Sequence, residues 1–152
     1  MRIGESVREL LLAGSATIVA TRDDELRPAL TRGWGVAVGE DGARLTLCVG
    51  TPPGSSVRAN LEANGEIAVT CSRPTTYRTV QVKGTATILG APTDEQLQAV
   101  RAQVAAFSAE VEQLGLPADS GALLLDADLT AIAVQPQAVF DQTPGPGAGA
   151  RV

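Results

Sequence analysis

The chain has 152 residues, of which 44% are hydrophobic and 19% charged, so it is long enough and apolar enough to form one domain with its own core. Its formal net charge of −5, without any basic run, argues against binding driven by nucleic-acid phosphates. No apolar stretch is long enough to cross a membrane and no secretory signal is visible, so the cytoplasm is the expected compartment.

Histidine is absent from the chain. This absence excludes histidine metal sites, Ser–His and Cys–His nucleophilic catalysis, and histidine-ligated haem. The cysteines, Cys48 and Cys71, are spaced like no metal or redox motif, so we interpret both as small buried hydrophobic residues. No metal site is expected.

The first third of the chain predicts a short helix followed by three strands. Residues 2–12 place Val7, Leu10 and Leu11 on one side of a helix that Gly14 ends. Strands are predicted over 16–21, 27–38 and 44–49, separated by a polar turn at 22–25 and a hairpin turn at 40–42. The Pro- and Gly-rich loop 50–54 then stops the third strand.

A second helix is predicted to begin at Ser55 or Ser56, because a serine hydroxyl can cap the free N–H groups of a first helical turn. The positive end of the helix dipole lies at that turn, and Arg58 adds a full positive charge. The pattern suits a small anion site with phosphate geometry. The alternative is a capped surface helix with an exposed arginine.

Two strands follow this helix. The β-branched run 67–72 lies between Gly65 and Pro74, and residues 79–89 alternate strictly between apolar and polar side chains. Gly84, in the middle of the second strand, indicates a bulge or the close approach of another backbone.

The last third predicts a long helix, two closing strands and a tail. Thr93 and Gln96 form a capping box, and apolar residues recur every three or four positions from Leu97 to Leu114. This stripe packs on the sheet or faces a partner. Closing strands are predicted over 122–125 and 129–134. One domain therefore spans 1–142, and the Gly/Pro-rich tail 143–152 is expected to be partly disordered unless it lies on a neighbour or a cofactor.

Short alternating strands joined by hairpin-length turns favour a mainly β fold with peripheral helices, closed into an antiparallel barrel, over a βαβ fold. Closure also removes exposed sheet edges.

Three segments carry a resemblance to a known family: Ser56-x-Arg58-x-x-Leu61, residues 67–70, and residues 77–84. Together they resemble the FMN-binding split barrels related to pyridoxamine 5′-phosphate oxidase, and residues 139–147 resemble the tail of an uncharacterised branch of that family. The resemblance covers nearly the whole chain. It implies a six-stranded antiparallel split β-barrel that binds FMN between the two subunits of a homodimer.

The resemblance also implies a set of cofactor-binding residues. Ser56 and Arg58, with Arg27, would hold the flavin phosphate, and Arg32 matches a basic residue near the substrate. Thr51 matches a hydroxyl near the flavin, and Thr79 takes the place of a glutamine that contacts the ring. Gln81 shares the face of Thr79 and would compensate for it. Trp34 would stack on the ring or on a partner, or pack as a core residue.

The implied function is that of an FMN-dependent oxidoreductase that transfers hydride between a reduced nicotinamide or other small donor and a small acceptor. The catalytic residues are unknown. The oxidase proper closes its substrate site with an arginine and a histidine near its C-terminus, and this chain lacks that histidine, so oxidation of pyridoxine phosphate is not supported. The alternatives are a deazaflavin-dependent reductase and a non-catalytic module with or without flavin, which Thr79 and the Pro52-Pro53 loop favour.

Overall fold

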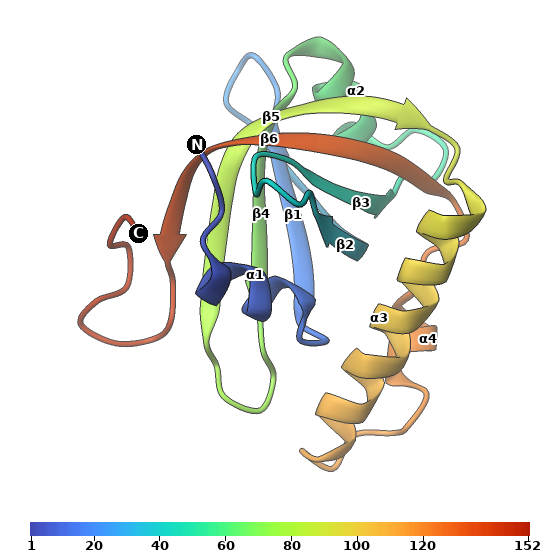
Figure 1. The fold of residues 1–152 in the computed structure, drawn as a ribbon. Coiled ribbons are helices and arrows are strands. Elements are labelled where there is room, and N and C mark those ends of the chain that lie inside the picture. The colour runs from blue at the N-terminus through green and yellow to red at the C-terminus, as the bar shows by residue number, and fades with distance from the viewer.

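Six antiparallel strands form a closed barrel in the computed structural model, which describes residues 1–152 (Figure 1). They are β1 (Ala16–Arg22), β2 (Pro28–Val38), β3 (Leu45–Gly50), β4 (Glu66–Ser72), β5 (Thr79–Gly90) and β6 (Leu129–Asp141). Their order around the barrel is β1-β2-β3-β6-β5-β4, with β4 returning to β1. The predicted antiparallel barrel is therefore confirmed.

One face of each strand fills the barrel, because alternate residues of a strand point to opposite sides of a sheet. Val19, Val69 and Val82 are fully buried in the interior. Helix α1 (Glu5–Leu12) adds Leu10 and Leu11 to this core at the end where β1 begins. Helix α2 (Ser56–Ala63) closes the opposite end, where Asn60 donates to the hydroxyl of Thr21.

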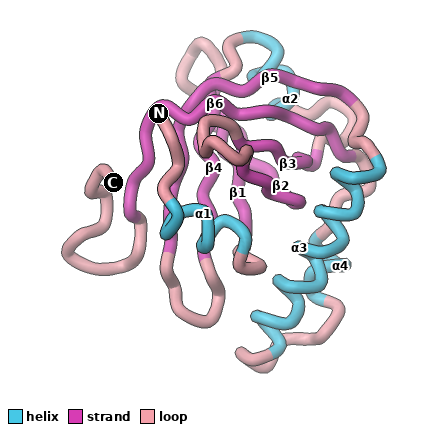
Figure 2. Tube along the Cα trace, viewed as in Figure 1, coloured by secondary structure: helices cyan, strands magenta, loops and turns pink.

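Helix α3 (Asp94–Glu112) packs on the outside of β2 (Figure 2). The buried residues of its apolar stripe face the barrel, the first of the two placements that the sequence allows. Its capping box of Thr93 and Gln96 is present. Trp34 is buried under this helix and meets Phe107 edge-on, with ring centroids 5.8 Å apart. Trp34 is thus a core residue. Gly35 lets the helix approach, since a Cβ there would lie 2.9 Å from the backbone nitrogen of Val100.

The predicted strand over 122–125 is wrong: residues Ser120–Leu124 form a short helix, α4, beside α3. A short apolar run does not distinguish a strand from a helical turn by its periodicity. The second closing strand is longer than predicted, since β6 continues to Asp141 along β5. A bulge lies at Gly84, where a Cβ would overlap the carbonyl oxygen of Gln135.

The C-terminal tail folds back on β6 instead of being partly disordered. β3 pairs with β6 only as far as Val134, which leaves one edge of the later residues of β6 open. The tail covers that edge: Asp141 donates to the carbonyl of Ala150 at 2.9 Å, and Val152 donates to that of Val139 at 2.9 Å. The tail therefore protects a sheet edge. No helix of the chain is long and apolar enough to span a bilayer.

Candidate functional site

The start of α2 presents unpaired main-chain donors. Pro52 and the residues after it turn the chain out of β3, and the N–H of Ser55 donates to the carbonyl of Pro52. Ser55 is the cap, since its hydroxyl accepts from the N–H of Arg58 at 3.2 Å. The N–H groups of Ser56 and Val57 have no partner within the chain. These groups and the exposed hydroxyl of Ser56 suit an anion at the positive end of the helix dipole.

The guanidinium of Arg58 lies beside these donors and is held on two sides. Its Nε lies 2.9 Å from Oε1 of Glu62, one turn further along α2, and its Nη1 donates to the hydroxyl of Thr130 at 3.3 Å. Thr130 is buried and shares a 2.6 Å hydrogen bond with the hydroxyl of Thr51. Nη2 of Arg58 has no partner in the chain, so one nitrogen of the guanidinium is free for a ligand while the other two are engaged.

Arg58 and the turn before α2 border a pocket of about 500 Å³. Its lining is Thr51, Pro52, Pro53, Gly54, Ser55, Ser56, Arg58, Ala59, Glu62 and Asp128. The structure thus brings together three predicted site residues, Thr51, Ser56 and Arg58. The donor set fits a phosphate, which accepts from N–H, hydroxyl and guanidinium groups. Two carboxylates, those of Glu62 and Asp128, line the same pocket beside its single arginine.

Arg27 is not among the lining residues. It lies in the turn before β2 with 70% of its side chain exposed, and its ion-pair partners are Asp23 at 2.7 Å and Glu25 at 3.2 Å. Hydrogen bonds from the backbone and side chain of Arg27 hold the pKa of Asp23 below its usual range. The ion pairs of Arg27 are therefore within its own turn.

Two other predicted residues share one transverse row on the outer face of the barrel. Arg32 of β2 pairs in register with Ile18 of β1, Ile18 with Thr70 of β4, and Thr70 with Gln81 of β5. The amide of Gln81 donates to the hydroxyl of Thr70 at 3.0 Å. The hydroxyl of Thr79 is engaged elsewhere, with Ser72 and with the carbonyl of Tyr77.

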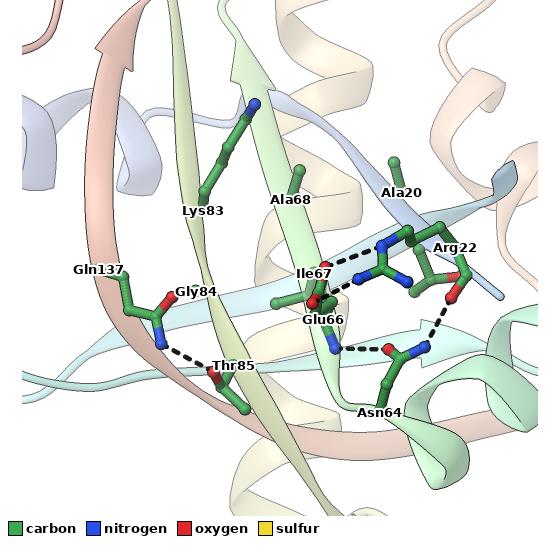
Figure 3. A pocket seen from close by; sticks show the side chains of 11 residues that line it. Ala20, Arg22, Asn64, Glu66, Ile67, Ala68, Lys83, Gly84, Thr85 and Gln137 are labelled. Atoms are coloured by element: carbon green, nitrogen blue, oxygen red, sulfur yellow. Dashed lines mark hydrogen bonds and ion pairs between the residues drawn. The ribbon is translucent and has the colours of Figure 1, made fainter. Parts of the chain in front are cut away.

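A second, wider depression of about 590 Å³ lies on the same outer face (Figure 3). Arg22 and Glu66 form a two-pronged ion pair in it, at 2.9 and 2.6 Å. Lys83 has no carboxylate partner, and its Nζ lies 5.3 Å from the ring centroid of Phe140. Lys83 is therefore the one lining cation here without a counter-charge.

The cysteines have no role in either depression. Burial raises the pKa of the Cys48 and Cys71 thiols to about 11, so neither forms the reactive thiolate at neutral pH. No cluster of metal-ligating side chains is present. The burial of Cys48 and Cys71 agrees with their interpretation as small hydrophobic residues.

Sequence reasoning did not find Glu62, Thr130 and Asp128. The spacing of Arg58 and Glu62 was a usable signal, since residues four apart on a helix are neighbours. Thr130 and Asp128 had no such signal, because both are far away in the sequence. Asp128 lines the pocket from the loop before β6, and Thr130 contacts Arg58 from β6 itself.

No protein-family model and no curated protein sequence matches the chain. Its fold is that of the split barrels related to pyridoxamine 5′-phosphate oxidase. A putative pyridoxamine 5′-phosphate oxidase of Lactobacillus delbrueckii is similar at 14% identity, with a TM-score of 0.56 over 91% of this chain and 93% of that one.

Two further solved structures share the fold. An F420 reductase is similar at 23% identity, with a TM-score of 0.54 over 90% of this chain and 98% of that one. The haem storage protein HutZ of Vibrio cholerae is similar at 17% identity, with a TM-score of 0.52 over 93% of this chain and 95% of that one. Proteins named for different cofactors thus share this barrel, so the fold alone does not choose among them.

Proposed function

We propose that the protein is an FMN-binding flavoprotein and acts as an oxidoreductase on small molecules. The observation that carries the proposal is the set of donors at the start of α2. The N–H groups of Ser56 and Val57, the hydroxyl of Ser56 and Nη2 of Arg58 belong to the first turn of α2, and Ser56 and Arg58 line one pocket. These groups suit the oxygens of a phosphate.

Bound FMN would supply the hydride chemistry, and the protein would supply position and electrostatics. Arg58 and Ser56 would hold the phosphate, and Thr51 would keep the Arg58 guanidinium in place through Thr130. On the outer face, Gln81 and Arg32 would donate hydrogen bonds to a flat ring system, with Arg32 also supplying positive charge. Thr79 is committed to internal hydrogen bonds and Arg27 to its own turn, so we assign both a lesser part.

Some similar structures are named for haem, but haem is a weaker candidate for this chain than a flavin. These 152 residues hold no histidine, and both cysteines are buried, so neither residue type offers an accessible ligand for the haem iron. A deazaflavin is the second candidate. Its polyanionic tail needs cations beyond the phosphate pocket, and Lys83 in the outer depression is one without a counter-charge. A flavin-binding module without turnover is the remaining alternative.

The test titrates FMN, riboflavin and the deazaflavin F420 into the purified protein and measures binding by the change in flavin fluorescence. FMN is expected to bind more tightly than riboflavin, which lacks the phosphate. Bleaching of the bound flavin by a reduced nicotinamide then separates an enzyme from a carrier. Absence of FMN binding by the protein would contradict the proposal.

Arg58→Ala is expected to weaken FMN binding by roughly ten- to a hundredfold, because a charge-assisted hydrogen bond contributes about 1.5–3 kcal/mol and 1.4 kcal/mol is a factor of ten. Riboflavin binding should be nearly unchanged. Arg101→Ala is the matched control, since it removes the same charge from an exposed position on α3. Equal losses for FMN and riboflavin would show that Arg58 does not contact the phosphate.

A further inference from the structure

The phosphate pocket contains a built-in competitor for its ligand. Glu62 lies one helical turn after Arg58 and occupies the Nε side of the guanidinium at 2.9 Å. Both side chains are about half exposed, at 48% and 56%. Exposed pairs at this spacing stabilise a helix by only about 0.3–0.5 kcal/mol, so a phosphate can displace the carboxylate.

The charged residues that line the pocket give a phosphate little net attraction, so competition for Arg58 affects its affinity. Arg58 is the only cation in its lining, and Glu62 and Asp128 are both acidic, which leaves a formal charge of −1 before a ligand enters. Arg27, the other predicted phosphate ligand, is paired with Asp23 and Glu25 outside the pocket. An entering phosphate therefore meets one arginine that is already neutralised and a second carboxylate nearby.

Glu62 is not needed to hold Arg58 in position. The guanidinium has a second anchor, because its Nη1 donates to Thr130 at 3.3 Å. Thr130 is itself fixed by Thr51 at 2.6 Å, and the N–H of Thr51 donates to the carbonyl of Asp128 at 2.8 Å. Loss of the Glu62 charge should thus leave the arginine beside the unpaired N–H groups of α2.

We infer that Glu62 competes with the ligand phosphate for Arg58 and keeps the flavin exchangeable, so that FMN is taken up and released as a dissociable ligand. The inference rests on the proposed function, since it assigns Glu62 a part in the same phosphate site. It makes Glu62 a determinant of affinity for the phosphate and leaves contacts with the ring unaffected.

The experiment compares the parent protein with Glu62→Gln in titrations of FMN and riboflavin at low and at high salt. Glutamine keeps the length of the side chain and an oxygen for Nε but removes the charge. FMN should bind about three- to tenfold more tightly to E62Q at low salt, the order of magnitude for removing one like charge beside a partly exposed site. The gain should shrink at high salt, because exposed charges are screened.

Two controls define the effect. Riboflavin affinity should be the same for the parent and E62Q. Glu9→Gln makes the same change in net charge at an exposed position on α1 and should leave FMN affinity unchanged. The dissociation rate of FMN, followed by dilution into apo-flavodoxin, should fall in E62Q by about the same factor as Kd.

The outcomes separate this inference from the proposed function. FMN binding by the parent with equal or weaker binding by E62Q overturns the role of Glu62 and leaves the flavoprotein assignment standing. A tightening that is equal for riboflavin also overturns it. FMN binding by E62Q alone supports the competition by Glu62 and contradicts flavin binding by the parent, whereas no binding by either protein overturns both.

Discussion

Gln103 is the buried amide that joins α3 to the barrel. Its Oε1 accepts from the N–H of Val36 at 3.0 Å, at the bulge of β2. Its Nε2 donates to the carbonyl of Ser15 at 2.9 Å and to the hydroxyl of Thr17 at 3.0 Å. One side chain thus satisfies polar groups of β2, of β1 and of the residue before β1, and buried polar groups are costly without partners.

Gln103→Leu should therefore destabilise the protein. The N–H of Val36 and the carbonyl of Ser15 would each lose a partner, at a cost of roughly 1–3 kcal/mol for each group. Urea unfolding should show a loss of about 2 kcal/mol or more in the free energy of unfolding. Gln98→Leu, at an exposed position of the same helix, should change it by no more than about 0.5 kcal/mol. A Gln103→Leu variant as stable as the parent would refute this role.

At the scale of elements, α3 is fastened to the loop between β4 and β5 by one carboxylate. Glu110 is buried, and Oε1 accepts from Arg73 at 2.9 and 3.1 Å. Its Oε2 accepts from the hydroxyl of Thr75 at 2.6 Å. The hydrogen bonds from Arg73, followed by those from Thr75, hold the pKa of Glu110 below its ordinary value. The charged form is thus favoured in the folded state.

Stability should consequently depend on pH through Glu110. A group whose pKa is lower in the folded state stabilises the fold fully above its unfolded pKa, about 4.3 for glutamate, and loses this contribution as pH falls through the folded pKa. The difference in Tm between the parent and Glu110→Gln should therefore be largest near neutral pH and shrink below about pH 4.3. Calorimetry from pH 7 to pH 3 measures it.

Glu112→Gln is the control for this measurement, since Glu112 is exposed and has no ion pair. Its Tm difference from the parent should stay small and flat with pH. A Tm difference for Glu110→Gln that stays constant down to pH 3 would mean that the ion pair with Arg73 does not stabilise the fold.

At the scale of the whole molecule, one sheet face has no helix over it. α3 covers the outside of β2, and α1 and α2 close the barrel ends, so the outer face of β1, β4 and β5 lacks a cover within the chain. Its centre is made of half-buried small or apolar side chains, Ile18, Ala20 and Ala68, in neighbouring registers. Leu30, beside Ala20, is 67% exposed.

We predict that this face joins two copies into a homodimer, with the flavin at the boundary that includes Arg32 and Gln81. The middle of the apolar stripe of α3, with Val100, Phe107 and Val111, is already buried on the barrel. An obligate interface would bury more than about 2,000 Å² in total. Analytical ultracentrifugation at micromolar concentration should give twice the mass of the chain.

Ala68→Arg should convert the dimer into monomers, because a charge at the centre of an apolar interface is left unpaired. Ala102→Arg, at an exposed position on α3, should remain dimeric. A parent that sediments as a single chain, or an A68R variant that remains dimeric, would contradict this interface.

The local elements could be predicted from the sequence because their signals are local. Alternation over residues 79–89 shows which side of β5 is buried, and the Thr93–Gln96 capping box marks the start of α3. The helix start at Ser55 and Ser56, with Arg58 one turn inside, likewise needs no distant contact. The antiparallel class followed from the short turns between strands.

Only the tertiary structure decided what each of these elements meets. The run over 122–125 is compatible with a strand or a helix, and packing against α3 makes it α4. The tail is ordered because β3 ends early and leaves an edge of β6 open. The sequence pattern likewise did not determine the partners of the two arginines. Thr130 reaches Arg58 because distant strands pair, and Asp23 meets Arg27 because of the shape of a turn. Local patterns determine which face of an element is buried and where the element begins. The charge balance of a site, in contrast, depends on contacts between segments far apart in the chain.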